Sequence, residues 1–211
     1  MSLILDGTTG VPVTTVTGTL PVANGGSGVT TSTGTGAVVL GTSPSISGAV
    51  MSTMASSVLT SATAQASTSG TSINFTGIPS WAKRITVMLS GVSTNGTSAM
   101  LIQIGNGSVI TTGYAGAGVF VGVTSDWSNA SSGLSIEPST VAAAVRYGWA
   151  VLTTLGSNIW VMGSQVNRSN TATCQLGGGG ITLGGTLDRL RITTVNGTDT
   201  FDAGSINIMY E

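Results

Sequence analysis

The distribution of charge along the chain constrains its fold more than any other feature of the sequence. No charged residue lies between Asp6 and Lys83, whereas all six basic residues and six of the seven acidic ones lie from Lys83 onward. Residues 7–48 are dense in Gly, Thr and turn-forming pairs, with single apolar residues between them. Such a segment cannot close a hydrophobic core alone. We therefore divide the chain into an extended segment, 1–55, and a folded domain, 56–211.

The extended segment has three possible states: an intertwined oligomer, a disordered tail or a flexible linker. Disordered segments usually carry charge, which is missing here. Abundant Gly and uncharged side chains suit close packing of several backbones, because a charge at a shared axis would be desolvated without compensation. This favours a segment whose copies wrap together and share one core, and the other two states remain open.

The composition of the whole chain excludes several classes of function. Charged residues make up 6 % and the net charge is −1, so there is no electrostatic footprint for nucleic acid or an anionic membrane. The chain contains no His, which removes Ser-His-Asp catalysis and His-based zinc sites. The single Cys174 cannot form an intrachain disulfide. We expect no cofactor and no metal site.

Neither a secretion signal nor a membrane span is expected. The start, Met1 to Asp6, lacks a basic region, and its apolar run ends at Asp6. The longest apolar runs fall far short of the ~20 residues that cross a bilayer. We expect no membrane insertion.

The folded domain is expected to be an antiparallel β-sandwich. In residues 83–89, Ile85, Val87 and Leu89 alternate with more polar residues, as in a half-buried strand. Asn106-Gly107 predicts a hairpin, and residues 156–158 predict a turn between two strands. Further strands are expected at 99–104, 118–123, 145–153, 158–166, 171–176, 187–195 and 205–210. Only 140–145 could form a short helix, so the fold class is all-β, with a jelly-roll-like head.

Two parts of the sequence resemble bacteriophage tail fibre proteins. Residues 18–28 read Gly-Thr-Leu-Pro-Val-Ala-Asn-Gly-Gly-Ser-Gly, and 33–44 read Thr-Gly-Thr-Gly-Ala-Val-Val-Leu-Gly-Thr-Ser-Pro, similar to a repeat in that family. Residues 75–87 and 201–211 resemble the family's C-terminal domain. The chain differs from long fibres in being short, with a single copy of the repeat.

The resemblance implies a homotrimeric virion component that is assembled in the host cytoplasm and located in the tail. Its N-terminus would dock on other tail or baseplate proteins. Its β-sandwich would attach to the host surface, through a glycan or an outer-membrane protein. The alternatives are a purely structural tail component that contacts no receptor, and an adhesin or prophage-derived fibre.

Candidate contact residues lie in stretches that read as polar loops. Aromatic and amide side chains there can bind sugars or proteins, and loops often carry function. These residues are Tyr114, Trp127, Asn129, Asn167 and Arg168. Trp81, Trp149 and Trp160 are interpreted as core residues.

Catalysis is not expected. Paired carboxylates of the glycosidase type would have to come from a short set of acidic residues, for which turn formation or ion pairing is the simpler explanation. That set is Asp126, Glu137, Asp188, Asp199 and Asp202. Residues 177–180, four glycines, lack the Lys and the helix of a phosphate loop. We interpret them as a flexible loop or a place where chains approach closely.

Overall fold

The computed structural model describes residues 59–121, 126–138, 141–169 and 173–211, with side chains from 129 onward in the second range. The segment 1–55, with its predicted shaft and tail attachment, lies outside the described residues. Within the described ranges the chain is all-β, and every strand pairing is antiparallel. No helix long and apolar enough to cross a bilayer occurs there.

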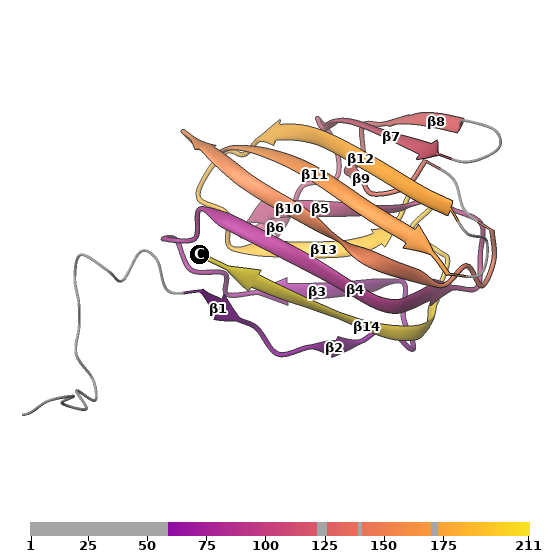
Figure 1. The fold of residues 1–211 in the computed structure, drawn as a ribbon. Coiled ribbons are helices and arrows are strands. Elements are labelled where there is room, and N and C mark those ends of the chain that lie inside the picture. Colours follow the sequence, from indigo (N-terminus) through magenta and orange to yellow (C-terminus); the bar gives the residue numbers. More distant parts are fainter. Residues whose placement is uncertain (1–58, 122–125, 139–140, 170–172) are drawn as a thin grey trace, which may run out of the picture. The chain divides into compact units, whose positions relative to one another are not determined.

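Most described strands belong to one large sheet, which lies in front of a smaller one in Figure 1. In spatial order, the large sheet contains β1 (Thr60–Ser61), β14 (Phe201–Tyr210), β4 (Arg84–Thr94), β10 (Arg146–Gly156), β11 (Ile159–Arg168), β12 (Thr173–Thr182), β7 (Ala115–Val121) and β8 (Asp126–Ala130), and β2 (Gln65–Ala66) also pairs with β14. The small sheet contains β3 (Ser72–Thr76), β13 (Arg189–Thr194), β5 (Met100–Asn106) and β6 (Ser108–Val109), and β9 (Leu134–Ser135) pairs with β5.

The two sheets share one hydrophobic core, so the arrangement is sandwich-like. Ile85, Val87 and Leu89 of β4 are buried, which confirms the alternation predicted from the sequence. Ile102 of β5 and Ile192 of β13 belong to the same core from the small sheet. Burial of alternate residues from both sheets is the main source of stability in such a fold.

Two predicted turns join consecutive strands in the structure. Asn106-Gly107 joins β5 to β6 as expected, with Gly107 at a φ of 71°. Ser157 and Asn158 join β10 to β11, and both have positive φ (49° and 60°), as a type I′ turn requires. The expected helix at 140–145 is wrong in its described part, because residues 141–144 form only a turn.

The loop expected at the Gly-rich run is wrong, whereas the alternative, a place where chains approach closely, stays a prediction. Residues 177–180 lie inside β12 and pair with β11 on one side and β7 on the other. A Cβ at Gly177 would overlap the carbonyl oxygen of Ser135, and one at Gly118 of β7 would lie 2.9 Å from the Ser135 hydroxyl. These glycines allow the segment around Ser135 to pass directly beneath the large sheet.

Candidate functional site

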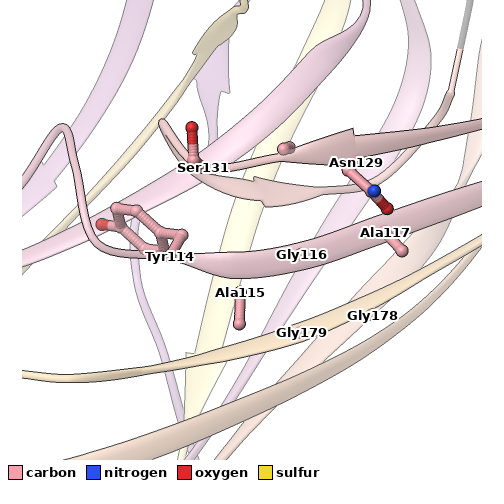
Figure 2. A pocket seen from close by; sticks show the side chains of 9 residues that line it. Tyr114, Ala115, Gly116, Ala117, Asn129, Ser131, Gly178 and Gly179 are labelled. Carbon is pink, nitrogen blue, oxygen red and sulfur yellow. The ribbon is translucent and has the colours of Figure 1, made fainter.

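A shallow hollow lies beside the edge of the large sheet formed by β7 and β8 (Figure 2). Its volume is about 600 Å³. The lining residues come from β7, β8, β12 and the segments next to them, and they are Tyr114, Ala115, Gly116, Ala117, Asn129, Ala130, Ser131, Gly178 and Gly179. None of them is charged.

The hollow exists because neighbouring strands carry almost no side-chain volume at this point. In the register of β7 and β12, Ala115 lies opposite Gly180 and Ala117 opposite Gly178. Cross-strand partners share one face of a sheet, so Ala115, Ala117 and Gly178 contribute only backbone and methyl groups to the floor of the hollow. Larger residues at the same positions would fill the hollow.

Tyr114 forms a fixed wall of the hollow. Its ring is 5 % exposed, and its hydroxyl accepts a hydrogen bond from the Ile104 N–H at 2.8 Å. The hydroxyl proton has two carbonyl acceptors, Ile110 at 2.9 Å and Ile104 at 3.1 Å. Burial raises the pKa of Tyr114 to about 12, although the backbone hydrogen bond from Ile104 opposes the shift. The hydroxyl therefore anchors the loop to β5 and does not face a ligand.

A second hollow adjoins the first across residues 129–131. Its volume is about 340 Å³, and residues 129–131 line both. Its other lining residues are Ser98, Ala99, Ser132, Ser135, Pro138 and Val195. Amide, hydroxyl and backbone groups are thus the polar atoms available in both hollows. This set can hydrogen-bond a neutral, hydroxyl-rich ligand, and it offers no cation for a phosphate.

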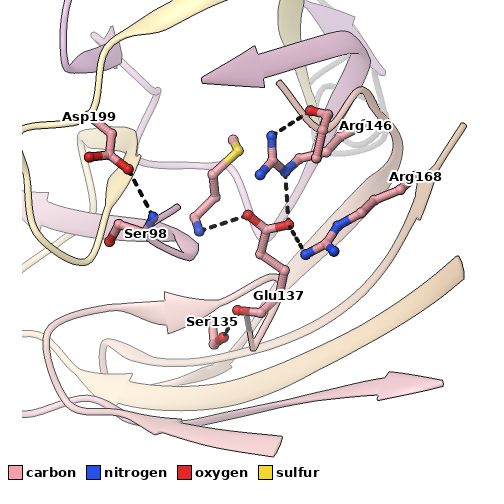
Figure 3. A network of polar contacts seen from close by, with 8 residues as sticks. Ser98, Ser135, Glu137, Arg146, Arg168 and Asp199 are labelled. Atoms are coloured by element: carbon pink, nitrogen blue, oxygen red, sulfur yellow. Dashed lines mark hydrogen bonds and ion pairs between the residues drawn. The ribbon is translucent and has the colours of Figure 1, made fainter. Parts of the chain in front are cut away.

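A buried ion network lies behind this region (Figure 3). Glu137 is fully buried and accepts hydrogen bonds from Arg146 Nε at 2.8 Å and from the Met100 N–H at 3.0 Å. Arg168 Nη2 lies 3.7 Å from the same carboxylate. In the amide orientation that satisfies both polar atoms of Gln175, its nitrogen donates to Glu137 at 3.0 Å and its oxygen accepts from Arg168 Nε at 2.6 Å.

The network compensates for two like charges placed directly opposite each other. Arg146 of β10 and Arg168 of β11 are cross-strand partners, and both side chains face the interior. Two facing cations are destabilising unless a counter-charge lies between them, and Glu137 supplies it. Burial lowers the pKa of Arg168, while the Glu137 carboxylate acts in the opposite direction. The Ser135 hydroxyl donates to the Glu137 carbonyl at 2.9 Å, which connects the network to the second hollow.

The structure brings two of the five predicted contact residues together. Tyr114 and Asn129 line the same hollow, and Asn129 is exposed. Trp127 lies on β8 with its side chain outside the described residues, and the loop predicted around Trp127 and Asn129 is wrong, because both belong to that strand. Asn167 is exposed on β11, away from both hollows, and Arg168 is buried. The loop predicted at Asn167 and Arg168 is wrong, because both belong to β11 and alternate outward and inward; the contact roles themselves stay predictions.

The sequence interpretation misplaced two of three tryptophans. Trp160 is buried as expected, but Trp149 is 45 % exposed and Trp81 is 38 % exposed. Tyr147, which the sequence did not single out, is 47 % exposed on the same face as Trp149. Alternation along β10 was the available signal, but it does not say which set of side chains faces the core.

The described acidic side chains each have a structural partner. Asp188 pairs with Arg189 at 2.8 Å, and the hydrogen bond from Arg189 lowers the pKa of Asp188. Asp199 accepts from the Ser98 N–H at 2.8 Å, and Asp202 accepts from the Ser93 hydroxyl. The side chain of Asp126 lies outside the described residues. Within the described ranges, no three His, Cys, Asp or Glu side chains are grouped to hold a metal ion.

Comparison of the chain with protein-family models, with curated proteins and with solved structures finds no match.

Proposed function

We propose that this chain is a short bacteriophage tail fibre whose C-terminal domain attaches to the host surface. The repeat-like sequence over 18–44 supports the fibre assignment. The antiparallel, sandwich-like domain is compatible with a jelly-roll-like fibre head. In this proposal the head belongs to a homotrimer in the virion tail, and the segment 1–55 docks on other tail proteins.

Attachment is assigned to the two adjoining hollows around residues 129–131. The observation that carries this assignment is their chemistry: two uncharged depressions that share an amide and a hydroxyl side chain, Asn129 and Ser131. Sugar rings present hydroxyls and apolar faces, which match hydrogen-bonding groups set among small apolar residues. We therefore propose a neutral portion of a host-surface glycan as the receptor.

Adsorption of the purified full chain to bacteria tests this function. Labelled protein is incubated with a panel of bacterial strains, and binding is competed with surface polysaccharide extracted from any strain that binds. Ser131→Lys places a long cation between the hollows and is expected to weaken adsorption at least tenfold, about 1.4 kcal/mol. Ser108→Lys is the matched control, because Ser108 is exposed on β6 of the other sheet.

Two outcomes would contradict the assignment. Equal adsorption by Ser131→Lys and Ser108→Lys would remove the hollows from the binding surface. Failure of the full chain to adsorb to any strain would favour the alternative, a structural tail component whose β domain packs on other virion proteins.

A further inference from the structure

The large sheet exposes a group of large apolar side chains on its outward side. We define this apolar face by the outward residues of β10, β11 and β12, which are Tyr147, Trp149, Val151, Ile159, Val161 and Leu176. Tyr147, Trp149 and Leu176 are each more than 40 % exposed. Large apolar side chains on one surface of a soluble protein mark a contact site when they are contiguous.

Strand register places these residues on one face of the sheet, interspersed with the amide side chains of Gln165 and Asn167. Trp149 lies opposite Gln165, Gln165 opposite Leu176, and Leu176 opposite Val119 of β7, which is also exposed. Directly paired residues lie on the same face with neighbouring Cβ atoms. The row that starts at Trp149 therefore crosses four strands and contains one polar side chain, that of Gln165.

Charge is absent from the outward positions of these four strands. Arg146 and Arg168, the charged residues of β10 and β11, both point inward to Glu137. At the middle of β11, the outward position is Gly163, so no bulky side chain rises from the face there. A surface of this kind can meet an identical surface without like-charge repulsion or steric conflict.

The area of the face suits a protein partner. With a rise of ~3.4 Å per residue and ~4.8 Å between strands, the length of β10 and the width of the three strands that define the face give ~540 Å² in projection. One partner in a standard protein interface buries ~800 Å².

We propose that the apolar face packs against further copies of this chain around the fibre axis. This inference rests on the proposed fibre, and it assigns the surface through which the heads assemble. Aliphatic side chains such as Ile159, Val161 and Leu176 offer no hydrogen bond to a sugar, so a copy of the chain fits them better than a glycan. Contact centred on β10 and β11 leaves the β8 edge of the sheet to a receptor.

Hydroxyl-radical footprinting of the full chain tests the proposal, with the mass measured by light scattering on the same sample. Trp149 is 45 % exposed and Trp81, outside the apolar face, is 38 % exposed, so Trp81 serves as an internal reference. The full chain is expected to be a multimer in which Trp149 is oxidised at least about fivefold more slowly than Trp81, as at the dry centre of an interface.

A pair of variants separates contact between heads from contact elsewhere in the chain. Val161→Glu places a charge in the apolar face and is expected to restore oxidation of Trp149 to the rate of Trp81, even if residues 1–55 still hold the copies together. Val141→Glu, at a 48 % exposed position outside the strands, is expected to leave Trp149 protected.

Three results would overturn the proposal. The first is a full chain that is monomeric by light scattering. This result overturns the proposal even if Trp149 is protected, because the protection would then come from the same chain. The second is a multimer in which Trp149 and Trp81 are oxidised equally fast. The third is a Trp149 that becomes protected only when surface polysaccharide is added, which would make the face a glycan platform. Protection of Trp149 without adsorption to cells would support the interface and refute the proposed function. Adsorption to cells without protection of Trp149 would support the proposed function and refute the interface.

Discussion

The two faces of β10 differ in an unusual way: the charged side chain lies on the inner face, and aromatic rings lie on the outer face. Its inner face buries Arg146 beside Ala150 and Leu152, whereas its outer face exposes Tyr147 and Trp149. A half-buried strand usually places the charge outside and the aromatic rings inside. Here the inversion is possible because Glu137 and Gln175 satisfy the buried guanidinium groups, and the exposed rings are left for a partner. A chain with few charges thus places two of its six basic residues in the interior.

The largest expected loss of stability comes from a substitution in the ion network on the inner face of β10. Glu137→Gln removes the carboxylate between Arg146 and Arg168, so the two buried cations lose the counter-charge that lies between them. We expect a loss of about 3–5 kcal/mol in the free energy of unfolding, measured by urea denaturation. Glu211→Gln is the control, because its pair with Arg84 is exposed and should change stability by less than about 1 kcal/mol. Equal stability of the two variants would refute the buried network.

Neighbouring residues on opposite faces of β10 give the next largest contrast. Leu152→Ala, at a fully buried position, is expected to cost about 3 kcal/mol in unfolding free energy because it leaves a cavity. Val151→Ala, on the outer face, should cost less than half as much. Thermal or urea unfolding of both variants measures this, and a larger loss for Val151→Ala would reverse the assignment of the two faces.

The backbone around Ser135 passes close beneath β12, and a substitution there is expected to cause a smaller loss of stability. Gly177→Ala would force its new methyl group into the Ser135 carbonyl and should destabilise the fold by about 2 kcal/mol. Gly163→Ala, outward on β11 with no atom within 4 Å of the added Cβ, should be neutral or slightly stabilising. If Gly177→Ala unfolds at the same urea concentration as Gly163→Ala, the close packing of Ser135 on β12 is wrong.

The smallest effect concerns Tyr114 and depends on pH. Tyr114→Phe leaves the buried Ile104 N–H without its acceptor and should cost about 1 kcal/mol near neutral pH. The folded-state pKa of about 12 lies above the ordinary value of 10.0, so the folded chain retains this proton longer than the unfolded chain. The stabilisation is therefore complete below about pH 10 and is lost as the pH rises toward 12. Unfolding of both proteins between pH 8 and 12 checks this: the difference should shrink above pH 10, and a constant difference would contradict it.

The sequence predicted the fold class and most long strands, because alternation and turn residues are local signals. Residues 85–89 alternate clearly, and Asn106-Gly107 marks a hairpin that the structure confirms. It could not predict the direction of alternation in β10, since both sets of side chains contain large apolar residues. Which set faces inward depends on Glu137, a residue from another segment that lies close only after folding.

The candidate site was predictable only in part for the same reason. Tyr114 and Asn129 were selected because they lie in stretches rich in Gly, Ser and Asn, and they do line one hollow. The glycines of β12 that form its floor were interpreted as a loop, because four consecutive glycines carry no strand signal. Their strand conformation comes from pairing with β7 and β11, which is not visible in the local sequence.

Hydrogen exchange at the arginine side chains tests the inverted polarity of β10 most directly. The chain has five arginines, of which Arg146 and Arg168 are buried and Arg84, Arg189 and Arg191 are not. In the ¹⁵N NMR spectrum of the full chain, we predict that two Nε–H signals persist for hours after transfer to D₂O and that Glu137→Gln accelerates their exchange. If all five signals vanish immediately in the folded protein, the charges do not lie inside and the account of both faces is wrong.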